Sequence, residues 1–129
     1  MKTNVQSYQI GSARKRGEGL RIGTVRYLPR GVRKDDYASK DYFDVWLPTL
    51  APSRDLMGWY KKGESSKERW QLFAKRYKTE MQKTDSRQTI VLLAKLGKKA
   101  PISIGCYCGN ENRCHRSILL KLIRNAGRS

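Results

Sequence analysis

The sequence has few residues of several types on which common classes of protein depend. It contains 3 cysteines and 1 histidine in 129 residues. An odd number of cysteines cannot pair completely within one chain, which excludes a fully paired disulfide framework. The longest apolar run covers only residues 90–94, and the first twenty residues hold no stretch of the kind that a secretory signal needs. We therefore expect a cytoplasmic protein that does not enter a membrane and keeps its thiols free.

Acidic residues are also scarce. There are 11 Asp and Glu against 28 Lys and Arg, so the formal net charge is +17. The excess is uneven, because residues 1–34 carry +8, residues 35–84 carry +2 and residues 85–129 carry +7. This pattern favours an anionic partner, either an anionic small molecule or nucleic acid. No RNA-binding sheet signature, zinc-finger spacing or basic zipper accompanies the charge, and ordinary solvated surface charge is the simpler alternative.

Hydrophobic periodicity indicates one α/β domain over residues 1–129, with a strand and a basic loop in 1–19 and the main part in 20–127. We expect a small parallel or mixed sheet flanked by helices. The patterns predict strands at 5–10, 20–27 and 101–108, and helices after Ser53, after Ser65 or Ser66, from Thr84 or Asp85 to Gly97, and from 114 to Gly127. Residues 41–53 are predicted to be extended with a broken tail, because Pro48 and Pro52 exclude a regular helix.

All three cysteines and the histidine lie between residues 106 and 115. Strand alternation over 101–108 predicts that Cys106 and Cys108 share a face with two isoleucines. This favours Cys106 as a small buried hydrophobic residue. Cys108 ends the strand, at the edge where ligands bind in open α/β sheets.

The pattern of residues 114–127 predicts a helix, and the start of this helix is expected to form the other half of the site. Its first turn holds Cys114, His115, Arg116 and Ser117. Free backbone N–H groups and the helix dipole bind anions there and favour a thiolate. Arg113 and Arg116 are expected to strengthen both effects. We expect Cys108 or Cys114 to act as nucleophile and His115 to carry the proton, while Arg116 and Ser117 hold an anion. The alternative is that His115 only caps and packs.

Established cysteine chemistries do not match the spacing. A phosphatase needs Cys, five residues and then Arg, and counting from Cys106 or Cys108 does not reach an arginine. A redox CxxC is absent, although Cys108 and Cys114 could pair if their Cα atoms came within about 7 Å. Closed tetrahedral zinc is disfavoured, because adjacent Cys114 and His115 side chains diverge on a helix. We therefore expect no metal and no cofactor.

Several segments carry a family resemblance. "RYLPRGVRKDD", "WLPTLAPSRDLMGWY", "RWQLFAKRY" and "PISIGCYC" leading to "NRCHRSIL" resemble the YeaO-like family of uncharacterised prokaryotic proteins, domain of unknown function family 488. The resemblance covers about residues 20–125. It implies a compact α/β fold and a cytosolic location, and no established reaction.

The resemblance also suggests which distant segments converge. Arg26 and Arg30 flank the end of the second strand, which in a parallel or mixed sheet can lie beside Cys108 and Cys114. The first hypothesis is an anion-binding α/β protein with a Cys/His/Arg site at the junction of strand, loop and helix, where an activated thiol serves an enzyme or a sensor for a phosphate-bearing or other anionic substrate. The second is a basic nucleic-acid-binding accessory module with incidental cysteines.

Overall fold

The computed structural model describes residues 3–37, 39–40, 42–108 and 113–128. Within these residues the strands are β1 (Val5–Gln9), β2 (Leu20–Gly23), β3 (Val45–Trp46) and β4 (Ile102–Cys106). The helices are α1 (Arg54–Lys62), α2 (Lys67–Glu80), α3 (Thr84–Leu96) and α4 (His115–Ala126), with single 3₁₀ turns η1 (Lys34–Asp36) and η2 (Pro48–Leu50). None of the helices in these ranges has the length and apolar character needed to cross a membrane.

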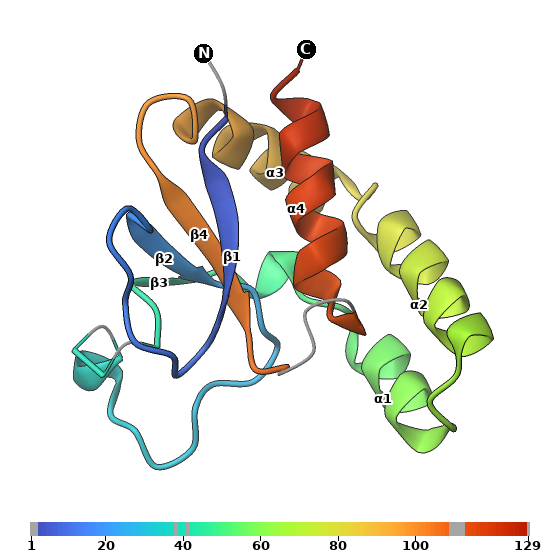
Figure 1. Cartoon of the computed structure of the whole chain (residues 1–129). Helices are drawn as coiled ribbons and strands as arrows, with labels where there is room; N and C mark the ends of the chain where they lie inside the picture. The colour runs from blue at the N-terminus through green and yellow to red at the C-terminus, as the bar shows by residue number, and fades with distance from the viewer. Residues whose placement is uncertain (1–2, 38, 41, 109–112, 129) are drawn as a thin grey trace.

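The sheet is parallel throughout, with strand order β1-β4-β2-β3 (Figure 1). Ile102 of β4 aligns with Val5 on one side and with Leu20 on the other. All five residues of β4 are buried, as expected for a strand of a parallel sheet that is covered on both faces. The predicted α/β fold is confirmed, and β4 is a central strand whose carboxyl end is flanked by those of β1 and β2.

One face of the sheet is covered by helices. In Figure 1 helices α1, α2 and α4 lie together on one side of the sheet, and loops lie on the other. The helix side holds the main core, formed by aliphatic residues of the sheet and aromatic and aliphatic residues of the helices: Val5, Ile22, Ile102, Ile104, Leu56, Phe73, Tyr77, Ile90, Leu93, Leu119 and Ile123. Helix α4 therefore rests directly against β1 and β4.

The opposite face has a polar centre under a smaller apolar cluster. Arg21 and Ser103 are fully buried there, and the Tyr8 ring lies over the Arg21 guanidinium at 4.2 Å. The guanidinium forms an ion pair with Glu18 at 2.8 Å. The Ser103 hydroxyl donates to the Glu18 carbonyl at 2.8 Å. The loop between β1 and β2 is thereby attached to the sheet.

Helix starts agree with the capping prediction. The Ser53 hydroxyl accepts from the Leu56 N–H and the Ser66 hydroxyl accepts from the Arg69 N–H, each at 3.1 Å. Helix α4 ends before Gly127 as expected. The sequence was sufficient to predict where these helices begin, because each capping side chain bonds to a backbone N–H in the first turn of its own helix.

Three predicted segments differ in extent. The strand expected over 20–27 ends at Gly23, because beyond Thr24, whose N–H donates to the Gly105 carbonyl, the chain leaves the sheet. The strand expected over 101–108 ends at Cys106. In the 41–53 segment Pro48 starts a single 3₁₀ turn, since proline is tolerated at a first helical position.

Two glycines of the β1–β2 loop allow a matched test of this region. Gly17 and Gly19 both have positive φ, at 86° and 71°. A Cβ at position 17 meets nothing within 4 Å, whereas a Cβ at position 19 collides with the Pro101 carbonyl. We expect Gly17→Ala to lower the free energy of unfolding by about 1 kcal/mol, from backbone conformation alone. Gly19→Ala should lower it by about 2–5 kcal/mol, because the collision adds to that cost. Urea denaturation of both variants measures the difference, and equal losses would show that the loop does not sit against Pro101.

Candidate functional site at the end of the central strand

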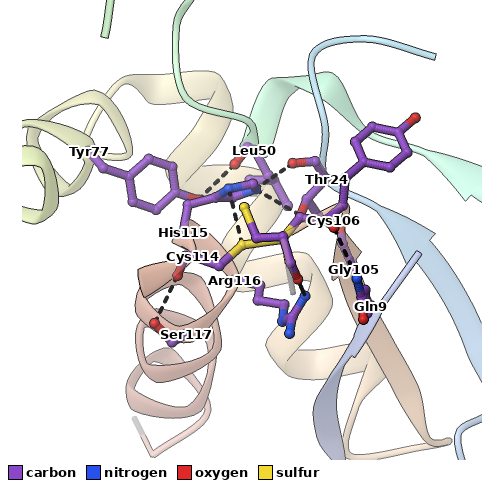
Figure 2. Close-up of a disulfide and its surroundings, with 12 residues drawn as sticks. Gln9, Thr24, Leu50, Tyr77, Gly105, Cys106, Cys114, His115, Arg116 and Ser117 are labelled. Atoms are coloured by element: carbon purple, nitrogen blue, oxygen red, sulfur yellow. Dashed lines mark hydrogen bonds between the residues drawn. A yellow bond between two sulfur atoms is a disulfide. The ribbon is translucent and has the colours of Figure 1, made fainter. Parts of the chain in front are cut away.

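The cysteines and the histidine meet where β4 ends and α4 begins (Figure 2). Cys106 is the last residue of β4, and Cys114 is the N-cap of α4. The two are joined by a disulfide, and each is only 1% exposed. Cys108 is free and exposed. The site therefore contains one buried sulfur pair and one accessible thiol.

This arrangement corrects three expectations. The prediction of free thiols is wrong for Cys106 and Cys114, although Cys106 is buried in an apolar cluster as expected. The partner of Cys114 is Cys106 and not Cys108. Cys106 and Cys108 also do not share a strand face, because β4 ends at Cys106 and alternation stops there. Residues 109–112 of the predicted loop lie outside the described residues.

His115 is held in one tautomer by the backbone. Its Nε2 lies 2.6 Å from the carbonyl oxygen of Thr24. A carbonyl can only accept, so Nε2 carries the proton and donates it. The unprotonated Nδ1 then faces the Cys114 sulfur at 3.9 Å (Figure 2). An imidazole lone pair is thus directed at the sulfur, as a proton acceptor for a thiol requires.

The expectation that the side chains of Cys114 and His115 diverge is wrong. It assumed that both residues have helical geometry. Cys114 instead has φ −123° and ψ 144°, which is extended, and only His115 is helical. The change of backbone conformation between them turns both side chains to the same side.

Burial keeps His115 neutral. It lowers the pKa of the imidazole to about 4, and the positive charge of Arg116 acts in the same direction, against the opposing effect of the Thr24 carbonyl. The Tyr77 ring packs edge-on against the imidazole at 5.5 Å between centroids. At neutral pH the ring is therefore a neutral acceptor in an apolar setting.

Arg116 and Ser117 both form hydrogen bonds where β4 ends and α4 begins. Arg116 is 4% exposed, and its Nη1 donates to the Cys108 carbonyl at 2.8 Å and to the Cys106 sulfur at 3.5 Å. Its Nε is buried and has no hydrogen-bond partner among the described residues. The Ser117 hydroxyl donates to the Cys114 carbonyl at 2.8 Å. Arg116 thereby attaches the end of β4 to the start of α4, whereas the Ser117 contact lies within the first turn of α4.

A cavity of about 520 Å³ opens beside the cluster. Arg26 and Arg30 line it together with Cys108, Cys114 and His115, while Arg116 and Ser117 do not. The segments after β2 and β4 meet because the carboxyl ends of neighbouring parallel strands lie at the same edge of a sheet. The remaining lining residues are Val25, Tyr27, Leu28, Pro29, Pro52, Met57, Tyr60, Lys61, Phe73, Cys106, Tyr107 and Arg113.

Several contributors to this site were not predicted. Thr24 acts through its backbone carbonyl, which has no sequence signature. Lys61 lies at the end of α1 and reaches the cavity only through packing of α1 beside α2. Arg113, by contrast, was expected to strengthen the anion site beside Cys114, and it does line the cavity. It donates to the Ser65 hydroxyl at 2.9 Å.

The buried cluster could also hold a metal ion. The ligand atoms of Cys106, Cys114 and His115 lie within 4.8 Å of one another. Two thiolates and an imidazole suit zinc, but they supply one ligand fewer than a closed tetrahedral site. Binding would require the disulfide to be reduced, because the thiolate is the ligand. The prediction of a metal-free protein remains a prediction.

Fold and site together define a parallel α/β domain with a cysteine–histidine cluster at the carboxyl edge of its central strand. The chain belongs to the DUF488 family, which confirms the YeaO-like resemblance: a family model described as the active DUF488-N3 subclade matches residues 5–127. It is 28% identical over 106 residues to uncharacterised proteins of Mycobacterium tuberculosis and Mycobacterium bovis, which covers 82% of this chain and 81% of theirs. No solved structure matches the chain.

Proposed function

We propose that this protein is a thiol-dependent enzyme that binds an anionic small molecule in the cavity and reacts with it through Cys114. The observation that carries the proposal is the meeting, in one cavity, of a cysteine–histidine pair with four basic side chains: Arg26, Arg30, Lys61 and Arg113. The description of the matching family as an active subclade agrees with a reacting centre.

The nucleophile of the reduced protein is Cys114. Its sulfur lies at the N-terminus of α4, where the helix dipole favours a thiolate. The lone pair of His115 Nδ1 faces it at 3.9 Å. Cys108 lines the cavity as well, but among the described residues its sulfur has no such acceptor beside it.

The proposed reaction is a group transfer. A thiol reductant first supplies two electrons and two protons to open the Cys106–Cys114 disulfide. The Cys114 thiol then gives its proton to His115 Nδ1, and its sulfur forms a bond to the electrophilic atom of the substrate. The bond to the leaving group breaks at the same centre, and the leaving group departs with the electron pair and the proton from His115. Water then releases the transferred group and restores the thiol.

The proposal is tested by comparing two alkylating reagents that differ in charge. In the reduced protein, iodoacetate and iodoacetamide should both modify Cys114, and site-resolved mass spectrometry gives the two rates. Because basic side chains concentrate anions in the cavity, the rate ratio of iodoacetate to iodoacetamide should exceed that of free glutathione by about tenfold or more. Lys61→Ala should lower this ratio.

Two controls make the result specific. Arg87→Ala removes an exposed charge from α3, away from the cavity, and should leave the ratio unchanged. Cys108→Ser should leave Cys114 alkylation intact. A reduced protein in which Cys114 is inert to both reagents, or reacts without preference for the anion, would contradict the proposal.

A further inference from the structure

The wall of the cavity combines positive charge with apolar surface. It contains four basic side chains and no aspartate or glutamate among the described residues. The rest is dominated by apolar and aromatic side chains, namely Val25, Tyr27, Leu28, Pro29, Pro52, Met57, Tyr60, Phe73 and Tyr107. A simple inorganic anion would use only the charged part. The wall is therefore complementary to an anion attached to an apolar body.

Two of the four cations are available to a ligand. Arg26 donates to the carbonyls of Ala51 and Pro52 at 3.2 Å, and Arg113 donates to Ser65. In the described part of the chain Arg30 and Lys61 have no ion pair or side-chain hydrogen bond. A dianion such as a phosphate monoester can pair with both without breaking an internal contact.

The aromatic wall is held in place. The Tyr107 hydroxyl donates to the Tyr27 carbonyl at 2.8 Å. The Tyr60 ring packs against Phe73 at 4.9 Å between centroids. Tyr27 and Tyr107 are nevertheless 49% and 41% exposed. The Arg54 guanidinium lies over the Tyr27 ring at 5.7 Å, and the remaining surface of both rings is accessible to a ligand. Fixed aromatic faces bind planar groups by stacking, and nucleobases are the planar groups that most often accompany a phosphate.

The size of the cavity agrees with such a ligand. At about 520 Å³ it lies within the range of roughly 300–1,000 Å³ that is typical of small-molecule sites. A phosphate ion alone would leave most of this space to water. A base and a ribose would fill the part lined by aromatic residues.

We propose that the cavity binds a nucleoside monophosphate, with its phosphate paired to Arg30 and Lys61 and its base against the tyrosine rings. This inference deepens the proposed function by naming the class of its substrate. It rests on that function for the reacting residue, but binding can be measured without any reaction.

The test is calorimetric titration of the full chain, reduced and carrying Cys114→Ser, with AMP, GMP, CMP and UMP. At least one of the four should bind. Ribose 5-phosphate lacks the base and the matching nucleoside lacks the charge, and each should bind at least about tenfold more weakly than the nucleotide. Arg30→Ala and Lys61→Ala should each weaken nucleotide binding about tenfold, whereas Arg87→Ala should not.

Each other outcome overturns the inference. No binding of any nucleotide, or equal binding of ribose 5-phosphate, would remove the nucleobase from the proposal. Unchanged affinity in Arg30→Ala and Lys61→Ala would place the ligand elsewhere. A single-stranded oligonucleotide that binds far more tightly than any monomer would favour the nucleic-acid-binding alternative. An anion preference of Cys114 alkylation that persists without nucleotide binding would leave the proposed function standing while this inference fails.

Discussion

Glu18→Gln is expected to lower the free energy of unfolding by about 3–5 kcal/mol, because it removes the carboxylate that forms an ion pair with the buried Arg21 guanidinium. Arg21 is 0% exposed and Glu18 is 6% exposed. The guanidinium donates to both carboxylate oxygens, with the shortest contacts at 2.8 Å. Glutamine has almost the same shape, so the change removes charge rather than volume.

The same variant should alter the acid sensitivity of the protein. Burial raises the pKa of the Glu18 carboxyl, but the hydrogen bond from Arg21 and the one from the Lys15 N–H outweigh it, and the net pKa is below its ordinary 4.5. A lowered carboxyl pKa contributes stability that is fully present above pH 4.5 and is lost as the pH falls through the folded value. Glu18→Gln lacks this contribution and should lose less stability than the wild type on acidification.

Chemical denaturation at pH 7 and at pH 3 measures both effects. Glu64→Gln changes an exposed glutamate and serves as the control, with an expected change within about 0.5 kcal/mol at pH 7. A loss below about 1 kcal/mol for Glu18→Gln at pH 7 would show that the pair is solvated rather than buried.

Reduction is expected to switch the reactivity of Cys114 from absent to present. A sulfur in a disulfide is not alkylated, so without reductant iodoacetamide should modify only Cys108. Dithiothreitol supplies two electrons and two protons, after which Cys114 should also react. We expect the alkylation rate at this residue to rise more than about a hundredfold, because only the reduced sulfur can form the thiolate that reacts.

Cys106→Ser separates the effect of the disulfide from other effects of reductant. Without its partner, Cys114 stays a thiol and should react at once, with or without dithiothreitol. Cys108→Ser should keep the dependence on reductant, because Cys108 lies outside the pair. Wild-type Cys114 that reacts equally fast before and after reduction would rule out the disulfide as the control of this site.

Local signals predicted much of the fold. The caps at Ser53 and Ser66 and the stop at Gly127 depend on contacts within one turn of their own helices, and a one-dimensional pattern contains those contacts. The strand at 102–106 was recognisable because Ile102, Ile104 and Cys106 alternate with smaller residues directly after Pro101. Its final residue was not, because the end of a strand depends on where its neighbours stop.

The candidate site was predicted in part for the same reason. Cys114 and His115 were identified from their place at a helix start, and the fold sets both beside Arg26 and Arg30 in one cavity. The pairing of Cys106 with Cys114 was missed, since it depends on the extended backbone of an N-cap residue. Lys61 was missed because its position relative to the cavity is a property of helix packing.

The amino-acid sequence by itself determined the positive charge, the order of strands and helices, and the gathering of all cysteine and histidine side chains into ten positions. Only the tertiary structure decided which sulfurs pair, which nitrogen of His115 faces Cys114, and which basic side chains surround the cavity. Composition and periodicity predict helices and strands because these depend on contacts between residues that are close along the chain. The chemistry of this site depends instead on the register of parallel strands and on the backbone carbonyl of Thr24. That carbonyl is 91 residues from His115 in sequence and 2.6 Å from its Nε2 in space.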